Sequence, residues 1–355
     1  MTDAVLVTGA FGLVGTATVR HLAAAGRRVV ATDLDTPANR RAAGGVPAGV
    51  PVRWADLTDP AAVEALLSAV RPTSIVHLAA VIPPLCYTKP TLARKVNVDA
   101  TANIVKVAAA QPDCPRLVLA SSIAVYGPRN PHRNSEPLDA DTPVRPCDVY
   151  GRHKAEAEAV VRESGLPWVI LRLGGVLAAE PRLHADSDLL YLVGALPADG
   201  RLQTVDVRDV AHAFAAATTA EVIGRTLLIG GDASHRQVQG EITAATAAAA
   251  GLVGAVPAGR VGDPDNDEAW FATDWMDCAE AQRLLEFQHH PWPQMLAETA
   301  ELVGPLRYPL RLLAPLVRQL LKRRSPYRRR PGRYADPWGA IGRRWGVAAM
   351  GGGAS

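Results

Sequence analysis

The sequence predicts an α/β fold in which a doubly wound parallel sheet is followed by a smaller C-terminal substrate lobe. Short apolar runs alternate with helical patterns through the first 173 residues, and a glycine-rich turn joins the first run to the first helical pattern. After Gly174 the alternation loosens. Repeated strand–helix units of this kind place a parallel sheet between two layers of helices. Hydrophobic residues make up 48% of the 355 residues and charged residues 21%, which allows a sizeable core.

The expected strands are apolar runs rich in β-branched residues, a pattern typical of buried parallel strands. They cover residues 4–8, 29–33, 74–80, 117–121, 168–173 and 225–229. Helical periodicity separates them at 60–70, 92–110 and 149–164, and it recurs at 237–250, 279–287 and 294–303. We therefore expect a Rossmann-like domain at 1–173, whose sheet is completed by about 203–230. Residues 174–202 and 231–304 would form the substrate lobe.

The glycine-rich turn has the spacing GxxGxxG and lies directly between the first strand and the first helix. Glycines let the backbone approach a pyrophosphate, which then lies on the positive N-terminus of the helix. Asp33 ends the second strand, where a carboxylate can accept both ribose hydroxyls and repel a 2′-phosphate. These features predict an NAD-binding domain, although Arg40 and Arg41 follow closely and could reach a phosphate. The expected contacts are Gly9, Phe11, Gly12, Leu13, Val14, Gly15 and Asp33, with Asp56 and Leu57 at the adenine. A surface position is the alternative for Asp56.

A second group of residues predicts acid–base chemistry. Ser122 lies at the end of one strand, and Tyr150 and Lys154 lie one turn apart on the same face of the next helix. A free tyrosine has a pKa near 10, roughly three units too high for a base at neutral pH. The lysine ammonium and an oxidised nicotinamide would both favour the phenolate. We expect Tyr150 to act as the general acid/base and Ser122 to hold the substrate oxygen beside it.

The ordered motifs resemble those of the extended short-chain dehydrogenase/reductase family, also called the NAD-dependent epimerase/dehydratase family, over about residues 3–304. They are TGAFGLVG at 8–15, Asp33, HLAA at 77–80, VNV at 96–98, SSIAVYG at 121–127, YGRHK at 150–154 and VDVRDVA at 205–211. The resemblance implies that Ser122, Tyr150 and Lys154 are catalytic, and that Lys154 also binds the nicotinamide ribose. It adds Leu78, Ala79, Ala80, Asn97, Tyr150 and Lys154 to the cofactor contacts, and it makes His77 a packing residue.

The sequence departs from the pattern of the family at two places. Dehydratases of this family that act on nucleotide sugars carry an Asp-Glu pair after the active Ser/Thr, and Ile123 and Ala124 stand there in this chain. Sugar-nucleotide members usually carry an asparagine where this chain has Gly174. The segments 81–85 and 189–193 are apolar. If they face the cleft instead of packing in the core, the substrate is more hydrophobic than a sugar diphosphate.

The leading hypothesis from the sequence is an NAD(H)-dependent oxidoreductase that interconverts an alcohol and a carbonyl on a small, hydrophobic substrate. The alternative is an epimerase or dehydratase with transient hydride transfer, on a nucleotide sugar or a related compound. A third hypothesis, a non-catalytic dinucleotide-binding protein, is disfavoured because both Tyr150 and Lys154 are present. We expect a homodimer that takes a small-molecule substrate and no nucleic acid.

The four cysteines, Cys86, Cys114, Cys147 and Cys278, show no metal-ligand spacing, so we expect free thiols and no metal site. The N-terminus lacks a basic region and a cleavage site, and no run of about 18 apolar residues occurs. A cytoplasmic location is the resulting expectation.

Residues 305–355 form a predicted basic, amphipathic tail. Residues 305–344 contain twelve Lys/Arg and one acid, a net charge of +11, which leaves −8 on the remainder. The residues Leu310, Leu313, Ala314, Val317, Leu320 and Leu321 share one helical face. Pro309 and Pro315 predict that the continuous helix is limited to about 314–324. We expect weak peripheral contact with anionic membranes, with packing on the body or a second subunit as the alternative. Tyr334, Trp338 and Trp345 predict that the end of the chain packs.

Overall fold

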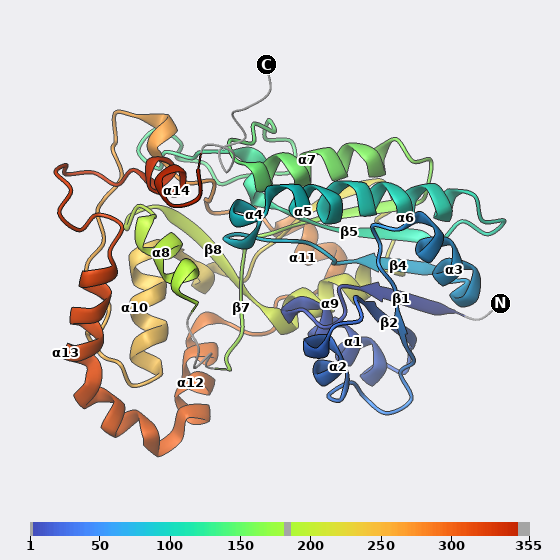
Figure 1. The fold of residues 1–355 in the computed structure, drawn as a ribbon, viewed down its shortest axis with the longest axis horizontal. Coiled ribbons are helices and arrows are strands. Elements are labelled where there is room, and N and C mark those ends of the chain that lie inside the picture. Colours follow the sequence, from blue (N-terminus) through green and yellow to red (C-terminus); the bar gives the residue numbers. More distant parts are fainter. Residues whose placement is uncertain (1–2, 181–185, 347–355) are drawn as a thin grey trace.

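The computed structural model describes residues 3–180 and 186–346, and its main feature is a seven-stranded parallel sheet between two layers of helices (Figure 1). The strand order is β3-β2-β1-β4-β5-β6-β9. The strands are β1 (Ala4–Thr8), β2 (Arg28–Asp33), β3 (Val52–Trp54), β4 (Ser74–His77), β5 (Arg116–Ser122), β6 (Trp168–Leu173) and β9 (Arg225–Ile229). Every strand pair is parallel, which confirms the predicted doubly wound fold.

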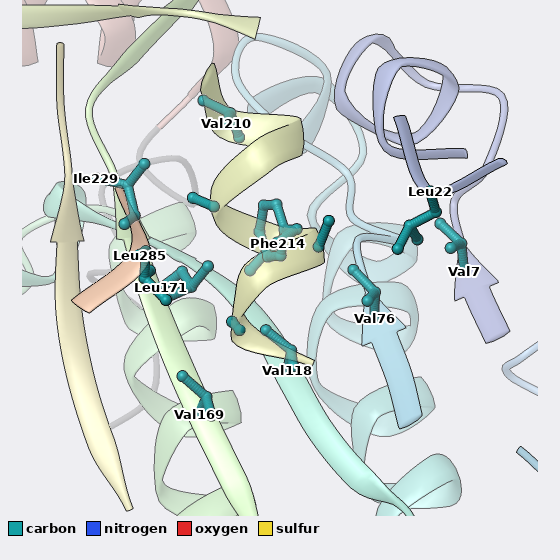
Figure 2. Close-up of a cluster of buried hydrophobic side chains, with 14 of the residues drawn as sticks. Val7, Leu22, Val76, Val118, Val169, Leu171, Val210, Phe214, Ile229 and Leu285 are labelled. Carbon is teal, nitrogen blue, oxygen red and sulfur yellow. The ribbon is translucent and has the colours of Figure 1, made fainter. Parts of the chain in front are cut away.

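Two apolar cores hold the helices against the sheet. One face carries α1 (Leu13–Ala24), α9 (Val207–Ala217) and α11 (Ala279–Leu285), and the other carries α3 (Pro60–Val70), α6 (Ala100–Ala109) and α7 (Val149–Arg162). On the first face Phe214 of α9 is fully buried among Val118, Val76 and Leu171 of three strands (Figure 2). This burial fixes the strand ends, where the functional residues lie.

The smaller lobe, which contains β7 and β8 (Figure 1), is built on a separate three-stranded sheet with the order β10-β8-β7. Its elements are β7 (Gly175–Leu177), α8 (Ser187–Ala195), β8 (Arg201–Asp206), β10 (Arg236–Val238), α10 (Gln239–Ala249) and α12 (Trp292–Val303). The prediction that residues from about 203 onward complete the main sheet is wrong for β8, and only β9 joins that sheet. An apolar run shows that a strand exists without showing its partner. At Gly174 the chain leaves β6, and a side chain there would meet the carbonyl oxygen of Gln203 at 2.5 Å.

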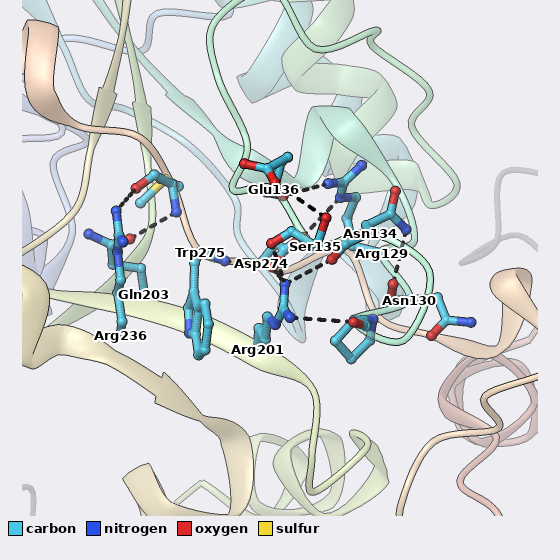
Figure 3. Close-up of polar contacts among 12 residues, drawn as sticks. Arg129, Asn130, Asn134, Ser135, Glu136, Arg201, Gln203, Arg236, Asp274 and Trp275 are labelled. Atoms are coloured by element: carbon cyan, nitrogen blue, oxygen red, sulfur yellow. Dashed lines mark hydrogen bonds and ion pairs between the residues drawn. The ribbon is translucent and has the colours of Figure 1, made fainter.

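A polar network ties the lobe to the loop that follows β5 (Figure 3). Arg201 of β8 donates to the carbonyl oxygens of Asn134 and Pro131, at 2.8 and 3.3 Å. Arg129 of the loop donates to the buried Asp274 carboxylate at 3.0 Å. Arg201 also lies 3.8 Å from the other carboxylate oxygen of Asp274, so both arginines hold the segment 271–276, whose first residues reach the cavity described below.

The C-terminal part contains two helices, α13 (Arg307–Arg324) and α14 (Pro337–Trp345). The prediction that prolines limit the first helix to about 314–324 is wrong, because α13 is continuous from Arg307. Pro309 lies in the first turn, where backbone N–H groups have no intrahelical acceptor. Pro315 lies inside the helix and removes one donor, whose acceptor carbonyl belongs to the solvent-exposed Arg311.

The last helix of the described residues, α14, packs onto α8 of the lobe and onto Tyr87, which confirms the predicted packing of the segment that carries Trp338 and Trp345. The Trp345 ring lies 5.5 Å from the Tyr87 ring and 5.6 Å from the Tyr191 ring, between centroids. The Tyr191 hydroxyl donates to the Ala340 carbonyl oxygen at 3.2 Å, and Arg344 pairs with Asp188 at 2.6 Å. None of the helices in the described part of the chain is long and apolar enough to span a bilayer.

Candidate active site

The N-terminus of α7 places the predicted tyrosine at the end of β5. Asp148 is the N-cap residue, and its Oδ1 accepts from the backbone N–H of Gly151 at 2.8 Å. A side chain at Gly151 would lie 2.5 Å from the Ala124 carbonyl oxygen, so glycine lets the helix approach the strand end closely. Tyr150 is thereby brought beside Ser122, the last residue of β5.

The structure brings the three predicted catalytic residues together. Ser122 is hydrogen-bonded to the Tyr150 hydroxyl, and the Ser122 Oγ also accepts from the backbone N–H of Ala124 at 3.2 Å. The Lys154 Nζ lies 5.9 Å from the centroid of the Tyr150 ring and donates to the Ala120 carbonyl oxygen at 2.7 Å. The lysine charge is therefore fixed next to the phenol.

Burial sets the acid–base properties of this group. Burial raises the pKa of Tyr150, and the hydrogen bond from Ser122 opposes this rise. Burial also lowers the pKa of Lys154 to about 8, while Glu158 acts in the opposite direction. Tyr150 is thus a protonated phenol at neutral pH, and it needs additional positive charge nearby before it can act as a base.

The glycine turn fits a dinucleotide. Gly9 has a φ of +63°, and a side chain there would lie 2.7 Å from the backbone nitrogen of Ala79. Helix α1 begins after Gly12 without any side-chain cap, so its first N–H groups are free to bind a phosphate. A cavity of about 920 Å³ opens beside this turn, lined by Phe11, Gly12, Leu13 and Arg208 among others. The predicted pyrophosphate site is therefore available.

Asp33 lies at the end of β2, next to the glycine turn. Its carboxylate accepts from the backbone N–H of Phe11 at 3.1 Å and from the Asn39 side chain at 3.1 Å. Arg40, one of the two arginines that could have favoured a 2′-phosphate, is instead paired with Asp35 at 2.7 Å. Both observations favour NAD over NADP.

The predicted adenine contacts lie on the neighbouring strand end. Asp56 is exposed, and its Oδ1 accepts from the backbone N–H of Thr58 at 2.9 Å. Leu57 is buried, and its carbonyl oxygen accepts from Asn103 at 3.0 Å. The Trp54 ring lies 5.4 Å from the Phe11 ring, so aromatic surface adjoins the same region.

The loop after β4, which carries Leu78, Ala79 and Ala80, is held by side chains from two directions. The Thr8 hydroxyl accepts from the N–H groups of Leu78 and Ala79 at 3.2 and 3.3 Å. Asn97, in a π-helical turn at Lys95–Asp99, accepts from the Val81 N–H at 2.7 Å and donates to the Val81 carbonyl oxygen at 2.9 Å. Both ends of the Asn97 amide therefore bind the loop, and we propose that Asn97 shapes the cofactor site through that loop.

His77 has the expected packing role. Its two ring nitrogens are hydrogen-bonded to Thr8 and Thr101 at 2.7 and 3.0 Å. Burial lowers the pKa of His77 to about 3, and the Lys154 charge acts in the same direction. A histidine that is neutral and bonded at both nitrogens has no free site for proton transfer.

A cavity of about 320 Å³ opens at Ser122 and Tyr150. Most of its lining is apolar: Val176, Leu177, Leu192, Val193, Leu196, Leu202, Ile242 and Phe271. Pro83 of the predicted apolar loop also lines it. Leu192 and Val193 therefore face the cleft. This agrees with the interpretation that segment 189–193 lines the substrate cleft, the alternative to packing in the core. Among the described residues of this lining, Asp148 is the one acidic side chain.

The sequence profile of the NAD dependent epimerase/dehydratase family matches residues 5–230. The chain belongs to this family. UDP-glucose 4-epimerase 4 of Oryza sativa subsp. japonica is 34% identical over 198 residues, covering 52% of each chain. UDP-glucose 4-epimerase of Azospirillum brasilense is 32% identical over 184 residues, covering 50% of each. The chain spans about half the length of the curated relatives it matches.

Solved structures share the fold over a larger part of the chain. The NAD complex of UDP-glucose 4-epimerase from Thermus thermophilus is 25% identical, with a TM-score of 0.68 over 85% of this chain and 99% of that one. MoeE5 in complex with UDP-glucuronic acid and NAD is also 25% identical, with a TM-score of 0.65 over 84% and 98%. This chain is therefore an NAD-dependent enzyme of the extended short-chain dehydrogenase/reductase type.

The two departures from the pattern of this epimerase/dehydratase family have structural explanations. Ile123 is buried in a cluster with Tyr126 and Leu138, so an acid at this position would lose solvation. Gly174 lines the cavity, and a side chain there would meet the Gln203 carbonyl oxygen and the Met276 side chain. The structure has no room for an asparagine at residue 174 without movement of β8.

Three supporting features of this family member escaped the sequence analysis. Asp148 caps the catalytic helix and accepts from the Tyr87 hydroxyl at 2.5 Å. Glu158, on the same helix as Tyr150, binds Ser121 and the buried Arg172. The third is the contact between α14 and the ring of Tyr87, since the sequence predicted that Trp345 packs but not against which residue. For the second feature a signal was available in the sequence. Arg172 lies inside the apolar strand run at 168–173, and a buried arginine requires a buried partner.

Asp33 carries the first testable prediction. We expect the enzyme to bind NADH more tightly than NADPH, because the Asp33 carboxylate lies beside the glycine turn, bonded to the Phe11 N–H, where it would repel a 2′-phosphate. Fluorescence titration with both cofactors measures this difference. Asp33→Asn should reduce the preference for NADH over NADPH. Asp35→Asn is the matched comparison, because it frees Arg40 from its ion pair and leaves Asp33 intact. Tighter binding of NADPH by the unaltered protein would contradict the assignment.

Among the described residues, no group of three histidine, cysteine or acidic side chains is placed to hold a metal ion, and the four cysteines are free thiols.

Proposed function

We propose that this enzyme is an epimerase that oxidises a secondary alcohol of its substrate and returns the hydride to the same carbon. The observation that carries the proposal is the acid–base group in the cavity, Tyr150 with Ser122 and Lys154. The acid Asp148 is already used by Tyr87 and the α7 N-terminus. Epimerisation needs one such group, whereas dehydration needs a further acid and base to expel water. The named relatives agree with this choice, since several are UDP-glucose 4-epimerases.

The residues have distinct tasks in this reaction. Ser122 holds the substrate oxygen next to Tyr150, and the Tyr150 phenolate accepts the hydroxyl proton as the alcohol becomes a carbonyl. Lys154 contributes a fixed positive charge that favours the phenolate. Bound NAD supplies the hydride acceptor and, on the return, the hydride donor. Tyr150 then gives back the proton when the alcohol forms again with the opposite configuration.

A second cavity supports a substrate with an anionic part. It has a volume of about 460 Å³ and shares Val193 and Thr243 with the cavity at Tyr150. Of the described residues that line it, none is acidic and five are basic: Arg260, Arg318, Lys322, Arg324 and Arg328. Guanidinium groups bind diphosphates well, so a nucleotide sugar could place its sugar at Tyr150 and its diphosphate here.

The apolar lining of the catalytic cavity supports a second candidate, a net oxidoreductase for a hydrophobic alcohol or ketone. No lysine or arginine is among the described residues that line this cavity. In that case the reduced cofactor would leave after each turnover, and the substrate would have to be small or mostly apolar.

The two candidates differ in a direct experiment. The purified enzyme is incubated with NAD and either UDP-glucose, UDP-galactose or a panel of apolar secondary alcohols, each deuterated at the reacting carbon. An epimerase gives the epimer with deuterium retained at that carbon and no steady increase in NADH absorbance. A net oxidoreductase gives stoichiometric NADH that carries the deuterium. Epimer without retained deuterium, or no product from any substrate by an enzyme that binds NAD, would contradict the proposal.

A further inference from the structure

The α12–α13 corner exposes an unusual amount of apolar surface. We define this corner surface as Leu302 of α12, Leu306, and the α13 residues Tyr308, Leu312, Leu313, Leu316 and Leu320, all of which are exposed. Leu312 is 81% exposed and Leu316 is 69% exposed. The corner projects from the edge of the lobe, away from the main sheet (Figure 1). Such a contiguous apolar patch marks an interaction site.

The body of the protein covers a different side of α13. Ala314 is its one buried residue, and Leu310, Val317 and Leu321 are half-buried on the same side. Around a helix of 3.6 residues per turn, the exposed leucines of the corner surface on this helix and at Leu306 cover an arc of roughly 120°. This arc adjoins the side of α13 that packs against the body. An arc of this width is broader than the narrow seam of a two-helix coiled coil. A broad and continuous apolar face of this kind is suited to a flat apolar boundary, such as the interface of a lipid bilayer.

Charge identifies the chemistry of that boundary. Residues 305–335 contain no acidic side chain, and their basic residues include Arg323 and Arg324 at the end of α13 and the triplet at 328–330 that follows. Pairing this surface with a second copy would bring two segments of the same charge together without any acid between them. Tyr308 lies at the edge of the leucine arc, a place that tyrosine prefers at a membrane–water interface.

We propose that the corner surface docks on a bilayer that contains anionic lipid. The leucines enter the boundary between headgroups and acyl chains, and Arg323, Arg329 and Arg330, which lie outside the basic cavity, bind the headgroup phosphates. The enzyme is held at the surface by α12 and α13 and does not span the bilayer. Because both apolar contact and charge contribute, binding requires anionic lipid and weakens as the salt concentration rises.

The test uses the full-length protein and sedimentation with vesicles of phosphatidylcholine alone or mixed with phosphatidylglycerol. We expect the protein to sediment with the mixed vesicles at low salt and to be released at high salt. Leu312→Gln/Leu316→Gln should lower the vesicle partition coefficient at least about tenfold. The control Ile223→Gln alters an exposed apolar residue outside the corner and should leave partition unchanged.

A second pair of variants separates charge from apolar contact. Arg323→Gln/Arg330→Gln should lower partition about tenfold or more, while Arg53→Gln/Arg283→Gln removes the same charge from exposed positions elsewhere and should have little effect. The proposal is wrong if the protein does not sediment with the mixed vesicles. It is wrong, too, if the corner-surface variants and their control variants sediment with these vesicles to the same extent. It is also wrong if Leu312→Gln/Leu316→Gln instead converts a dimer to a monomer by light scattering without any vesicle binding, because a second copy then covers the corner surface.

Discussion

Replacing Tyr150 by phenylalanine should lower kcat by at least about a hundredfold, the typical contribution of a positioned general acid–base group. The variant loses only the hydroxyl that is hydrogen-bonded to Ser122, while the ring keeps its packing. Cofactor affinity should change little, since the glycine turn and Asp33 are untouched. Steady-state kinetics and an NADH titration on the same preparation measure both quantities.

A matched control and a pH profile make this prediction specific. Tyr191→Phe removes a hydroxyl that donates to the Ala340 carbonyl oxygen outside the catalytic cavity, so its turnover should be close to normal. Burial raises the pKa of Tyr150, so the active phenolate is the minor form at neutral pH. The rate of the oxidation step should therefore rise with pH in the unaltered enzyme, and Tyr150→Phe should lose this dependence. Normal turnover in Tyr150→Phe would refute the assignment of Tyr150 as the acid–base group.

Replacing Glu158 by alanine should destabilise the fold by about 3–5 kcal/mol, the usual cost of leaving a buried charge without its partner. Glu158 and Arg172 are almost completely buried, and the Arg172 Nε and Nη2 donate to the two carboxylate oxygens at 2.9 and 2.7 Å. The same arginine also donates to the Tyr126 hydroxyl at 2.7 Å. Urea unfolding followed by circular dichroism measures the change in the free energy of unfolding.

Helix α7 supplies the control two residues away. Glu156 forms an exposed pair with Arg94 at 2.6 Å, and Glu156→Ala should cost no more than about 1 kcal/mol. The double variant Glu158→Gln/Arg172→Met should be less destabilised than Glu158→Ala, because no charge remains buried. Equal losses for Glu156→Ala and Glu158→Ala would show that the buried pair is unimportant.

The Glu158–Arg172 pair also predicts a pH dependence. Burial favours the neutral carboxyl, but the hydrogen bonds and charge of Arg172 outweigh it and lower the pKa of Glu158 below its ordinary value of 4.5. The stability from this shift is present above pH 4.5 and is lost as the pH falls through the lowered pKa. The unaltered protein should therefore lose more stability on acidification than Glu158→Gln does.

Local patterns in the sequence were sufficient for the elements that position the catalytic residues. The strand at 4–8 and the helix at 60–70 have the predicted bounds, because each is long enough for its apolar periodicity to be read without knowing its neighbours. The catalytic group was also predictable, since Tyr150 and Lys154 are one helical turn apart and Ser122 ends the preceding strand. These are short-range relationships.

Long-range pairing was not accessible in the same way. Whether β8 belongs to the main sheet depends on the strands with which it forms hydrogen bonds. The residues of β8 alone do not indicate that these strands are β7 and β10. The partner of Arg172 lies 14 residues earlier on a helix, and nothing in its immediate neighbourhood names Glu158. Pro315 misled the prediction of α13, because the cost of a proline depends on whether the carbonyl it leaves unbonded can reach water.

The contact of α14 with Tyr87 has a consequence for how the enzyme matures. Trp345 packs on Tyr87, the Tyr87 hydroxyl binds Asp148, and Asp148 caps the helix that carries Tyr150. During synthesis, Trp345 leaves the ribosome after β9, the strand that completes the main sheet. The sheet and its dinucleotide site can therefore fold before the segment that packs on Tyr87 is present. The outer support of the helix that carries Tyr150 is thus added after the sheet has been completed.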